Sequence, residues 1–516
     1  MKPIMSYALH WMRYKTCLSS SENRVCGDQS PHIPARKVII RPAPRNDSAP
    51  IPGNLSISSR VKRGCSFPRK GPSSPVKSYQ SKRADSKIAS EGENDTEPAT
   101  FSVTTQNNSL LSGTATKSAQ QVTGTPYIPI LQVDGGLRVT QLTFDGYGTF
   151  GGQFAPESIM GFLSEVTFCF KATVSDPGFW SEYARFRPAP TSLHVASNLT
   201  SLAKGATIWL KREDQNDYGS HKARNITGQL LLAKRMGRQE VVTDCASAKH
   251  GSFTAAMCAR LGLRCVIVMG TDDAKAQCND VAEIKALRAK VLITCTPSGM
   301  GSLRAAITEA LRYAVCHHES AYYLMGSPVG PSPLPTITRT FQSILGEEVM
   351  HEMHAQGIHP DALVVAIGGG SGAVGLFRPF LQDVSVRLVG VEAAQAAPLA
   401  TGELGVLHGA RTLMLQSPEG QITDSHSISP DMNLSTVGPE VAYWKDSERV
   451  EVSTATDEDA IHGFEVLRDQ EGILSGLDSS HAVRKTLDLA NSLGPGKNVV
   501  LMVTGRDKIA MRGTIL

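Results

Sequence analysis

Short apolar segments alternate with longer amphipathic segments over most of the chain, and this alternation restricts the possible fold more than any other feature. TIWLKRED (207–214) is typical of a strand and HKARNITGQLLLAKRMG (221–237) of a helix. Further strand-like segments are EVVTD (240–244), CVIVMG (265–270), KVLITC (290–295), ALVVAI (362–367), VRLVGVE (386–392) and NVVLMVTG (498–505). This order predicts an α/β protein whose parallel sheets are covered by helices on both faces.

The strand-like segments form two series, which predict an N-terminal α/β subdomain over 126–330 and a C-terminal one over 331–516. Ligands in such folds bind at the carboxyl ends of the strands, so we expect the site in the cleft between the two subdomains. Residues 1–125 are rich in Ser, Pro, Asn, Lys and Arg and lack periodicity, which predicts a disordered basic leader. The leader fits an organellar transit peptide, a plain disordered tail or a mistaken start site, so we expect a cytoplasmic or organellar (plastid or mitochondrial) protein.

Charge and cysteine usage exclude several classes of protein. Residues 1–90 contain 17 Lys and Arg against 4 Asp and Glu, whereas the rest contains 35 against 44. The acidic balance of the folded part argues against a nucleic-acid-binding body. No stretch approaches 18 uninterrupted apolar residues, so we expect no transmembrane helix. The ten cysteines are scattered without a Cys-x-x-Cys, and HEMH (351–354) lacks the spacing of zinc-binding helices, so no metal site is predicted.

TDCASAKHG (243–251) places a cysteine, an aspartate, a lysine and a histidine within a few positions. One hypothesis is a nucleophilic Cys245 with His250 as its base, which requires both side chains to be held on rigid elements. His250 instead follows Cys245 along a loop that leads into a predicted helix. We therefore favour the interpretation that Cys245 is a bystander and that Asp244 and the loop backbone carry the chemistry.

Two other segments carry candidate chemistry. AIGGGSGAVGLF (366–377) follows a predicted strand and opens a helix, so its backbone N–H groups and the Ser371 hydroxyl could bind a phosphate. It is neither a Walker loop nor a dinucleotide fingerprint, and a tight strand-to-helix turn is the alternative. GSHKARN (219–225) places Lys222 at the start of a helix beside His221. A desolvated lysine there could bind a carbonyl carbon covalently, and a solvated lysine is the alternative.

Together these segments resemble the β subunit of tryptophan synthase, a fold-type II pyridoxal-phosphate (PLP) enzyme. The resemblance covers roughly 140–510 in order, and the leader is not part of it. The matching segments are FGGQFAPE (150–157), LKREDQNDYGSHKARNITGQLLLAKRMG (210–237), YYLMGSPVGPSPLP (322–335), IGGGSGAVGLF (367–377), VGVEAA (389–394), GVLHGARTLMLQ (405–416), DSHSIS (424–429), VGPE (437–440), EGILSGLDSSHA (471–482) and TGR (504–506).

The resemblance implies roles for individual positions. Lys222 matches the lysine that holds PLP and moves the substrate's α-proton, and Asp244 stands at the position of the catalytic glutamate. The implied cofactor-binding residues are His221, Lys222, Gly368, Gly369, Gly370, Ser371, Gly372, Asp478 and Thr504. The implied substrate-binding residues are Cys245, Ala246, Ser247, Ala248, Lys249, His250 and Asn433.

Several of these positions depart from the family pattern. Asp244 is one methylene shorter than glutamate, which withdraws the carboxylate by roughly 1 Å, and a displacement of that size can cost about 10²-fold in rate. Ala246 and Ala248 replace glycines, and Lys249 adds a charge to the loop that binds the substrate carboxylate in the family. Other departures are Gly372 for an asparagine, Asp478 for a glutamate, and Asn433 and Ala276 for the two partners of a closing ion pair.

The resemblance implies a PLP-dependent lyase that performs β-replacement on L-serine, with indole as nucleophile and tryptophan as product. The departures keep another nucleophile or amino acid, or β-elimination with deamination, as alternatives. A hypothesis of another class is a catalytically lapsed member that binds PLP and serves as a partner protein. The family also implies a homodimer and leaves open an α subunit bound in trans.

Overall fold

The computed structural model describes residues 146–296 and 301–506. The predicted leader (1–125) and residues 126–145 of the predicted N-terminal subdomain lie outside the described residues, and so does the transit-peptide prediction.

The first sheet contains four parallel strands in the order β5-β4-β3-β6. Their bounds are Glu240–Cys245 (β3), Arg264–Gly270 (β4), Lys290–Thr294 (β5) and Ala321–Leu324 (β6). Three of the four begin at or within one residue of the segments predicted from the sequence. The sheet is parallel because each strand returns through a helix, and apolar β-branched runs such as Val241–Val242 pack on both faces.

Helices pack around this sheet in the manner that their apolar spacing predicts. They are α2 (Glu157–Val174), α3 (Pro177–Phe186), α5 (Lys222–Arg235), α6 (Ala248–Leu261), α7 (Thr271–Ala276), α8 (Cys278–Ala286), α9 (Leu303–Cys316) and α10 (Leu334–Gln342). Helix α9 buries Leu303, Ala306, Ile307 and Ala310, which recur at intervals of three and four residues and so form one stripe against β3 and β4. Helix α6 packs on the same two strands, beside α5 and α8.

The second sheet contains six strands in the order β1-β2-β12-β7-β8-β11. Their bounds are Leu193–Val195 (β1), Thr207–Arg212 (β2), Ala362–Ala366 (β7), Arg387–Ala393 (β8), Glu451–Ala455 (β11) and Asn498–Val503 (β12). All neighbours are parallel except β1 and β2.

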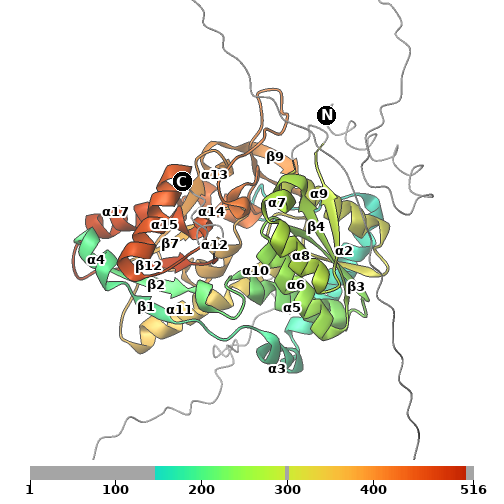
Figure 1. The fold of residues 1–516 in the computed structure, drawn as a ribbon, viewed down its shortest axis with the longest axis horizontal. Helices are drawn as coiled ribbons and strands as arrows, with labels where there is room; N and C mark the ends of the chain where they lie inside the picture. Colours follow the sequence, from blue (N-terminus) through green and yellow to red (C-terminus); the bar gives the residue numbers. More distant parts are fainter. Residues whose placement is uncertain (1–145, 297–300, 507–516) are drawn as a thin grey trace, which may run out of the picture. The chain divides into compact units, whose positions relative to one another are not determined.

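Strand β2 pairs with a strand from the far end of the chain. Thr207 lies opposite Asn498, and the register continues to Arg212 opposite Val503. Figure 1 shows the green β1 and β2 beside the red β12. The segment 193–212 therefore belongs to the second sheet, although the division at residue 330 places it with the first. Local propensity gives the strand, but its partner is chosen by burial between segments far apart in sequence.

The second sheet is covered by helices from the C-terminal part of the chain and by α4. These are α4 (Ser197–Ala203), α11 (Ile344–Ala355), α12 (Ser371–Leu376), α13 (Pro398–Thr401), α14 (Pro439–Asp446), α15 (Asp457–Glu471), α16 (Leu477–Ser480) and α17 (Val483–Leu493). Strands β9 (Glu403–Leu407) and β10 (Ala410–Met414) form a separate antiparallel hairpin that is not part of either sheet. Short 3-10 turns are η2 (Glu213–Gln215), η3 (Arg378–Phe380) and η4 (Pro430–Met432).

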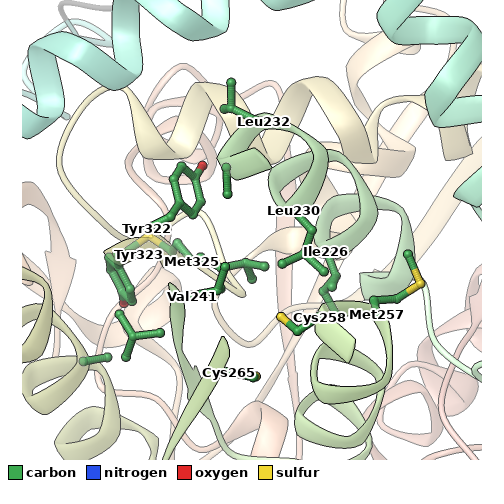
Figure 2. Packing of buried hydrophobic residues seen from close by; sticks show 14 of the residues in the cluster. Ile226, Leu230, Leu232, Val241, Met257, Cys258, Cys265, Tyr322, Tyr323 and Met325 are labelled. Carbon is green, nitrogen blue, oxygen red and sulfur yellow. The ribbon is translucent and has the colours of Figure 1, made fainter. Parts of the chain in front are cut away.

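The first subdomain has a continuous apolar core between α5, α6 and the sheet (Figure 2). Leu230, Leu232 and Val241 are fully buried there, and burial of each such side chain contributes about 1.5–3 kcal/mol. Cys258 and Cys265 lie in the same core as free thiols, as the apolar setting of these cysteines predicts.

The predicted fold class, an α/β protein with two parallel-sheet subdomains, is confirmed. None of the helices within 146–296 and 301–506 combines the length and the apolar character needed to cross a bilayer.

Candidate active site

A pocket of about 670 Å³, its opening to solvent included, lies between the two subdomains. Residues from both subdomains line it: His221, Lys222, Asp244, Ala246, His250, Leu303, Gly326, Ser327, Ala366, Gly368, Gly369, Gly370, Ser371, Gly372, Asp431, Met432, Asp478, Ser479, Met502 and Thr504. The carboxyl ends of β3, β7 and β12 all open into it, because the residues that follow these strands line the pocket. Its size suits a small organic ligand.

Lys222 is the first residue of α5 and reaches into this pocket. Its Nζ forms an ion pair with Oδ1 of Asp431, at 2.6 Å. Burial lowers the pKa of Lys222, but the charge and the hydrogen bond of Asp431 outweigh this effect and raise the pKa above its usual value. As a free amine, Lys222 is therefore a cation held in place by a carboxylate.

His221 precedes Lys222 and connects two other walls of the pocket. Its Nδ1 lies 3.0 Å from Thr504 Oγ1, and its Nε2 lies 2.9 Å from Ser371 Oγ. Burial, aided by the charge of Lys222, lowers the pKa of His221 to about 3. The imidazole is therefore neutral at physiological pH, and it fixes both hydroxyl groups without adding charge.

The glycine-rich turn leads from β7 into α12 and is packed too closely for side chains. A Cβ on Gly368 would lie 2.2 Å from the backbone oxygen of Asp431, and one on Gly369 would lie 2.7 Å from Ser327 Cβ. Gly370 precedes α12 with a φ of 99°, which favours glycine. The first N–H groups of a helix have no intrahelical acceptor, so this bare backbone and the Ser371 hydroxyl fit an anionic phosphate group.

Thr504 follows β12, the strand that pairs with β7 and its glycine turn. Its backbone oxygen accepts a hydrogen bond from Ser479 Oγ at 2.8 Å, and its hydroxyl faces His221. Asp478 lies beside it, with Oδ1 accepting the Ser479 N–H at 2.8 Å. The wall thus presents one neutral hydroxyl, held by His221, to whatever ring the pocket binds.

Asp244 lies at the end of β3 and is tied to the neighbouring strand. Its Oδ1 accepts a hydrogen bond from Tyr323 of β6 at 2.9 Å. Burial raises the pKa of Asp244 above its usual value, although the bond from Tyr323 opposes the rise. The side chain is thus a carboxyl group biased towards its protonated form at the pocket wall.

The loop between β3 and α6 is held by Gln277, a residue that the sequence did not single out. The Ala248 N–H donates to Gln277 Oε1 at 2.8 Å, and Gln277 Nε2 donates to the Ala246 carbonyl at 2.7 Å. Cys245 Sγ donates to the Ser247 carbonyl at 3.0 Å. One amide of the loop that was expected to bind a substrate carboxylate is therefore already engaged by a side chain.

The geometry supports the interpretation of Cys245 as a bystander. Burial raises the pKa of its thiol well above the usual value, which disfavours the thiolate. His250 Nε2 lies 3.1 Å from Thr243 Oγ1, and burial lowers the pKa of His250 to about 3.

The structure brings most predicted site residues together at the pocket. The predicted residues that line it are His221, Lys222, Asp244, Ala246, His250, Gly368, Gly369, Gly370, Ser371, Gly372, Asp478 and Thr504. Those outside its lining are Cys245, Ser247, Ala248, Lys249 and Asn433. Asn433 accepts a hydrogen bond from Ser425 Oγ at 2.8 Å instead.

Sequence reasoning missed Asp431 and Ser327 as pocket residues. Asp431 lies in SISPDMN (427–433), between two segments that the sequence did single out, and its Pro-Asp pair is typical of a turn. The hydroxyl of Ser327 is buried and has no hydrogen-bond partner among the described atoms. An unpartnered hydroxyl in a pocket wall suits a bound ligand. The described residues contain no group of three or more His, Cys, Asp or Glu arranged to hold a metal ion.

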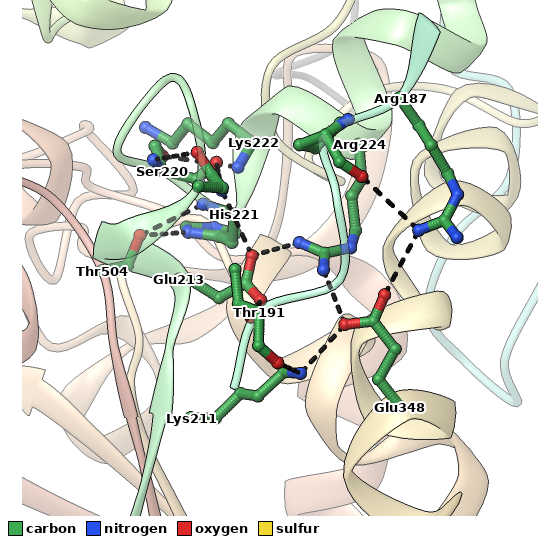
Figure 3. A network of polar contacts seen from close by, with 12 residues as sticks. Arg187, Thr191, Lys211, Glu213, Ser220, His221, Lys222, Arg224, Glu348 and Thr504 are labelled. Atoms are coloured by element: carbon green, nitrogen blue, oxygen red, sulfur yellow. Dashed lines mark hydrogen bonds and ion pairs between the residues drawn. The ribbon is translucent and has the colours of Figure 1, made fainter. Parts of the chain in front are cut away.

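A buried network of charges lies directly behind the lysine (Figure 3). Arg224, two residues after Lys222, forms ion pairs with Glu213 and with Glu348, the latter at 2.7 Å. Lys211 joins Glu348 at 2.9 Å, and Arg187 joins it at 3.4 Å. Glu213 and Lys211 come from the β2 region and Glu348 from α11, so the network fixes the start of α5 to the second subdomain.

Comparison with known proteins gives a consistent set of relatives. The family described as "Pyridoxal-phosphate dependent enzyme" matches residues 185–505. The chain is 42% identical over 373 residues to "Tryptophan synthase" of Saccharomyces cerevisiae (strain ATCC 204508 / S288c), a match that covers 70% of this chain and 52% of the yeast protein. The chain thus spans about half the length of this curated relative. A crystal structure of a threonine deaminase from the organism abbreviated T.th. matches with a TM-score of 0.48 and 18% identity, over 67% of this chain and 98% of that chain.

Proposed function

The chain belongs to the family of pyridoxal-phosphate-dependent enzymes, and from this premise we propose that it is a lyase that replaces the β-hydroxyl group of L-serine with indole, giving tryptophan. The observation that carries the proposal is Lys222, which reaches from the start of a buried helix into a pocket with a glycine cradle on its far side. The 42% identity to a tryptophan synthase supports the choice of substrates.

The pocket offers groups for each part of the cofactor. Gly368, Gly369, Gly370 and Ser371 would hold the phosphate, because a Cβ at the first two glycines would collide with the opposite wall. Thr504 would face the ring nitrogen as a neutral hydroxyl, fixed by His221. Gly372 and Asp478 would lie along the ring, and Lys222 would bind the cofactor's aldehyde carbon covalently.

Bound pyridoxal phosphate withdraws electrons from the α-carbon of an attached amino acid and so makes the α-proton acidic. Lys222 would take this proton on Nζ. Asp244 would give a proton to the departing hydroxyl group of serine and receive one from the nucleophile; general acid–base catalysis of this kind contributes about 10²–10⁴-fold. The substrate carboxylate would be oriented by His250 and by backbone N–H groups of the connection from β3 to α6 and the first turn of α6. This segment consists of Cys245, Ala246, Ser247, Ala248 and Lys249. Asn433 lies outside the lining of the pocket, so it would contribute to substrate binding only indirectly.

A second candidate, favoured by the setting of Asp244, begins with the same loss of the serine hydroxyl group. Either another nucleophile then adds at the β-carbon, or the product is released and water replaces its amino group, which gives a keto acid and ammonia. Tyr323 holds the short carboxyl group back against β6. A nucleophile smaller or more acidic than indole would depend less on that group.

The first experiment uses the full-length chain with added pyridoxal phosphate. We expect a visible absorption band and, after borohydride reduction, a cofactor adduct on the Lys222 peptide by mass spectrometry. Lys222→Ala should abolish both. Addition of L-serine and then indole should yield tryptophan; consumption of serine without indole would favour the second candidate. A wild-type chain without band or adduct would reject the enzyme and favour a lapsed partner protein.

We also infer a homodimer, with an α subunit in trans as an open alternative. Phe154 and Phe168 are 51% and 75% exposed, and a contact between subunits would remove such large aromatic side chains from water. Sedimentation of the purified chain measures the state directly, and a monomer at micromolar concentration would contradict the dimer.

A further inference from the structure

Asp431 lies closer to the reactive lysine than the other described carboxyl groups of the pocket. It belongs to the turn η4 of the second subdomain, whereas Lys222 opens α5 of the first. Their side chains meet across the cleft at 2.6 Å, with 21% and 16% of their surfaces exposed. Burial raises the pKa of Asp431, but Lys222 outweighs this effect and holds the pKa below its usual value. Asp431 is therefore ionised at neutral pH.

None of the other titratable groups described around this pair takes the place of Asp431 as the counter-ion of Lys222. Asp244 is bonded to Tyr323 and its pKa is raised by burial. Burial and the charge of Asp431 raise the pKa of Asp273 to about 8. Asp478 also raises the pKa of Lys222, with a smaller effect than Asp431. His221 and His250 are neutral because burial lowers the pKa of each to about 3. Arg224 lies behind His221, paired with two glutamates.

Two carboxyl groups in one pocket thus have opposite tendencies. Asp244 is biased towards the protonated form and can donate, whereas Asp431 is biased towards the ionised form and can stabilise a cation. Pairs whose surroundings separate their protonation in this way are typical of divided acid and base roles.

We propose that Asp431 is a further catalytic residue of this site: it is the counter-ion that keeps a proton on the Lys222 nitrogen, both in the free amine and when that nitrogen is bonded to the cofactor. The second half of this proposal rests on the proposed function. A protonated nitrogen makes the carbon bonded to it more electrophilic, so Asp431 prepares that carbon for attack by the amino group of an incoming amino acid. In that exchange the C–N bond to Lys222 breaks and the one to the substrate amine forms, while one proton passes from the substrate nitrogen to the Lys222 nitrogen. Lys222 therefore leaves as a neutral amine that can take the α-proton, and Asp431 stabilises the cation that results.

The first test needs no cofactor. Lys222 in the full-length chain is acetylated with trace acetic anhydride from pH 6 to 12, and the extent of labelling is read by mass spectrometry. Asp431→Asn should lower the pH midpoint by about one to three pH units, because an opposite charge at this distance has an effect of that size. Asp431→Glu keeps the carboxylate and should restore most of the shift.

The second test uses the cofactor-loaded chain. The visible band is titrated with pH, and Asp431→Asn should lose the band of the protonated form at a lower pH than wild type, again by about one to three pH units. Asp424→Asn is the matched control: Asp424 lies in the same connection and pairs with Arg304, and its side chain is 46% exposed. This control should titrate like wild type.

Identical midpoints for Asp431→Asn and wild type in both tests would overturn the proposal and leave the proposed function standing. A wild-type chain that forms no Lys222-linked band would reject the proposed function and the cofactor-linked half of this proposal, while the acetylation test still decides the half about the free amine. If Asp431→Asn unfolds, Asp431→Ser removes the same charge with a smaller side chain, and its midpoint is judged by the same criterion.

Discussion

At the scale of single residues, the site is defined by which groups carry charge. His221 joins Ser371 to Thr504 as a neutral ring, so the two hydroxyl groups are fixed without a counter-charge. Lys222 and Asp431 carry the charges that meet across the cleft. Asp244 is the one predicted catalytic group whose reach departs from the family pattern, and its hydrogen bond to Tyr323 holds it against the strand.

We predict that Asp244→Glu raises the rate of tryptophan formation from serine and indole, by up to about 10²-fold, because the extra methylene advances the carboxyl group by roughly 1 Å. Steady-state kinetics with indole as the varied substrate measure the effect. Asp446→Glu, an exposed residue at the end of α14, is the control and should leave the rate unchanged. A lower rate in Asp244→Glu would indicate that the pocket has adapted to the shorter acid and to another nucleophile.

At the scale of elements, the β9–β10 hairpin depends on a buried histidine at its turn. His408 has a φ of 51° and is 7% exposed, and its Nε2 has no hydrogen-bond partner among the described atoms. Burial lowers the pKa of His408 to about 3, with a smaller effect from Arg304. Because the folded state resists protonation, this histidine contributes stability above its unfolded pKa of about 6.5 that is lost as the pH falls.

His408→Asn should remove that pH dependence, since asparagine tolerates the left-handed backbone and does not titrate. Between pH 6.5 and pH 5 wild type should lose about 1.6 kcal/mol relative to the variant, because the slope rises from about 0.7 to about 1.4 kcal/mol per pH unit over this range. Urea unfolding at several pH values measures the difference. His462→Asn, at an exposed position in α15, is the control, and its free energy of unfolding should change with pH as that of wild type does. A constant difference between His408→Asn and wild type over this range would contradict the prediction.

At the scale of the whole described molecule, the network around Arg224 joins the two subdomains. Arg224, Lys211 and Arg187 meet the buried Glu213 and Glu348 and the partly exposed Glu352, so three cations meet three carboxylates. Removal of Arg224 leaves Glu213 buried without its cation and takes one of three cations from Glu348, which is far more destabilising than the loss of a surface ion pair. The network also fixes the start of α5, and therefore Lys222.

Arg224→Met should lower the free energy of unfolding by about 3–5 kcal/mol, because Glu213 and Glu348 lose their shared cation. The fall should appear as a lower urea midpoint with the slope little changed. Arg468→Met, which breaks the exposed pair with Asp469, should leave the midpoint in place. An unchanged midpoint in Arg224→Met would show that the network relaxes or admits water.

The sequence alone determined the strands and helices and the cofactor chemistry, and it predicted most of the residues that line the pocket. Strand and helix spacing predicted β3, β4, β5, β7, β8 and β12 almost to the residue, because periodicity and β-branched runs act locally. The segments around Lys222, Gly368 and Thr504 identified the cofactor chemistry, since a covalent lysine, a bare backbone and a hydroxyl group are needed wherever the fold places them.

Only the tertiary structure decided which residues meet. Strand β2 joins the second sheet because it pairs with β12 and because α4 and α17 pack on it. The pairing joins segments nearly 300 residues apart, which no local pattern encodes. Asn433 accepts a hydrogen bond from Ser425, and Gln277 accepts one from the Ala248 N–H. In both cases a neighbour in the folded chain satisfies the polar group. The ion pair of Lys222 with Asp431 is the clearest case. Each partner is an ordinary residue in its own segment, and only packing of one subdomain on the other brings their opposite charges to 2.6 Å.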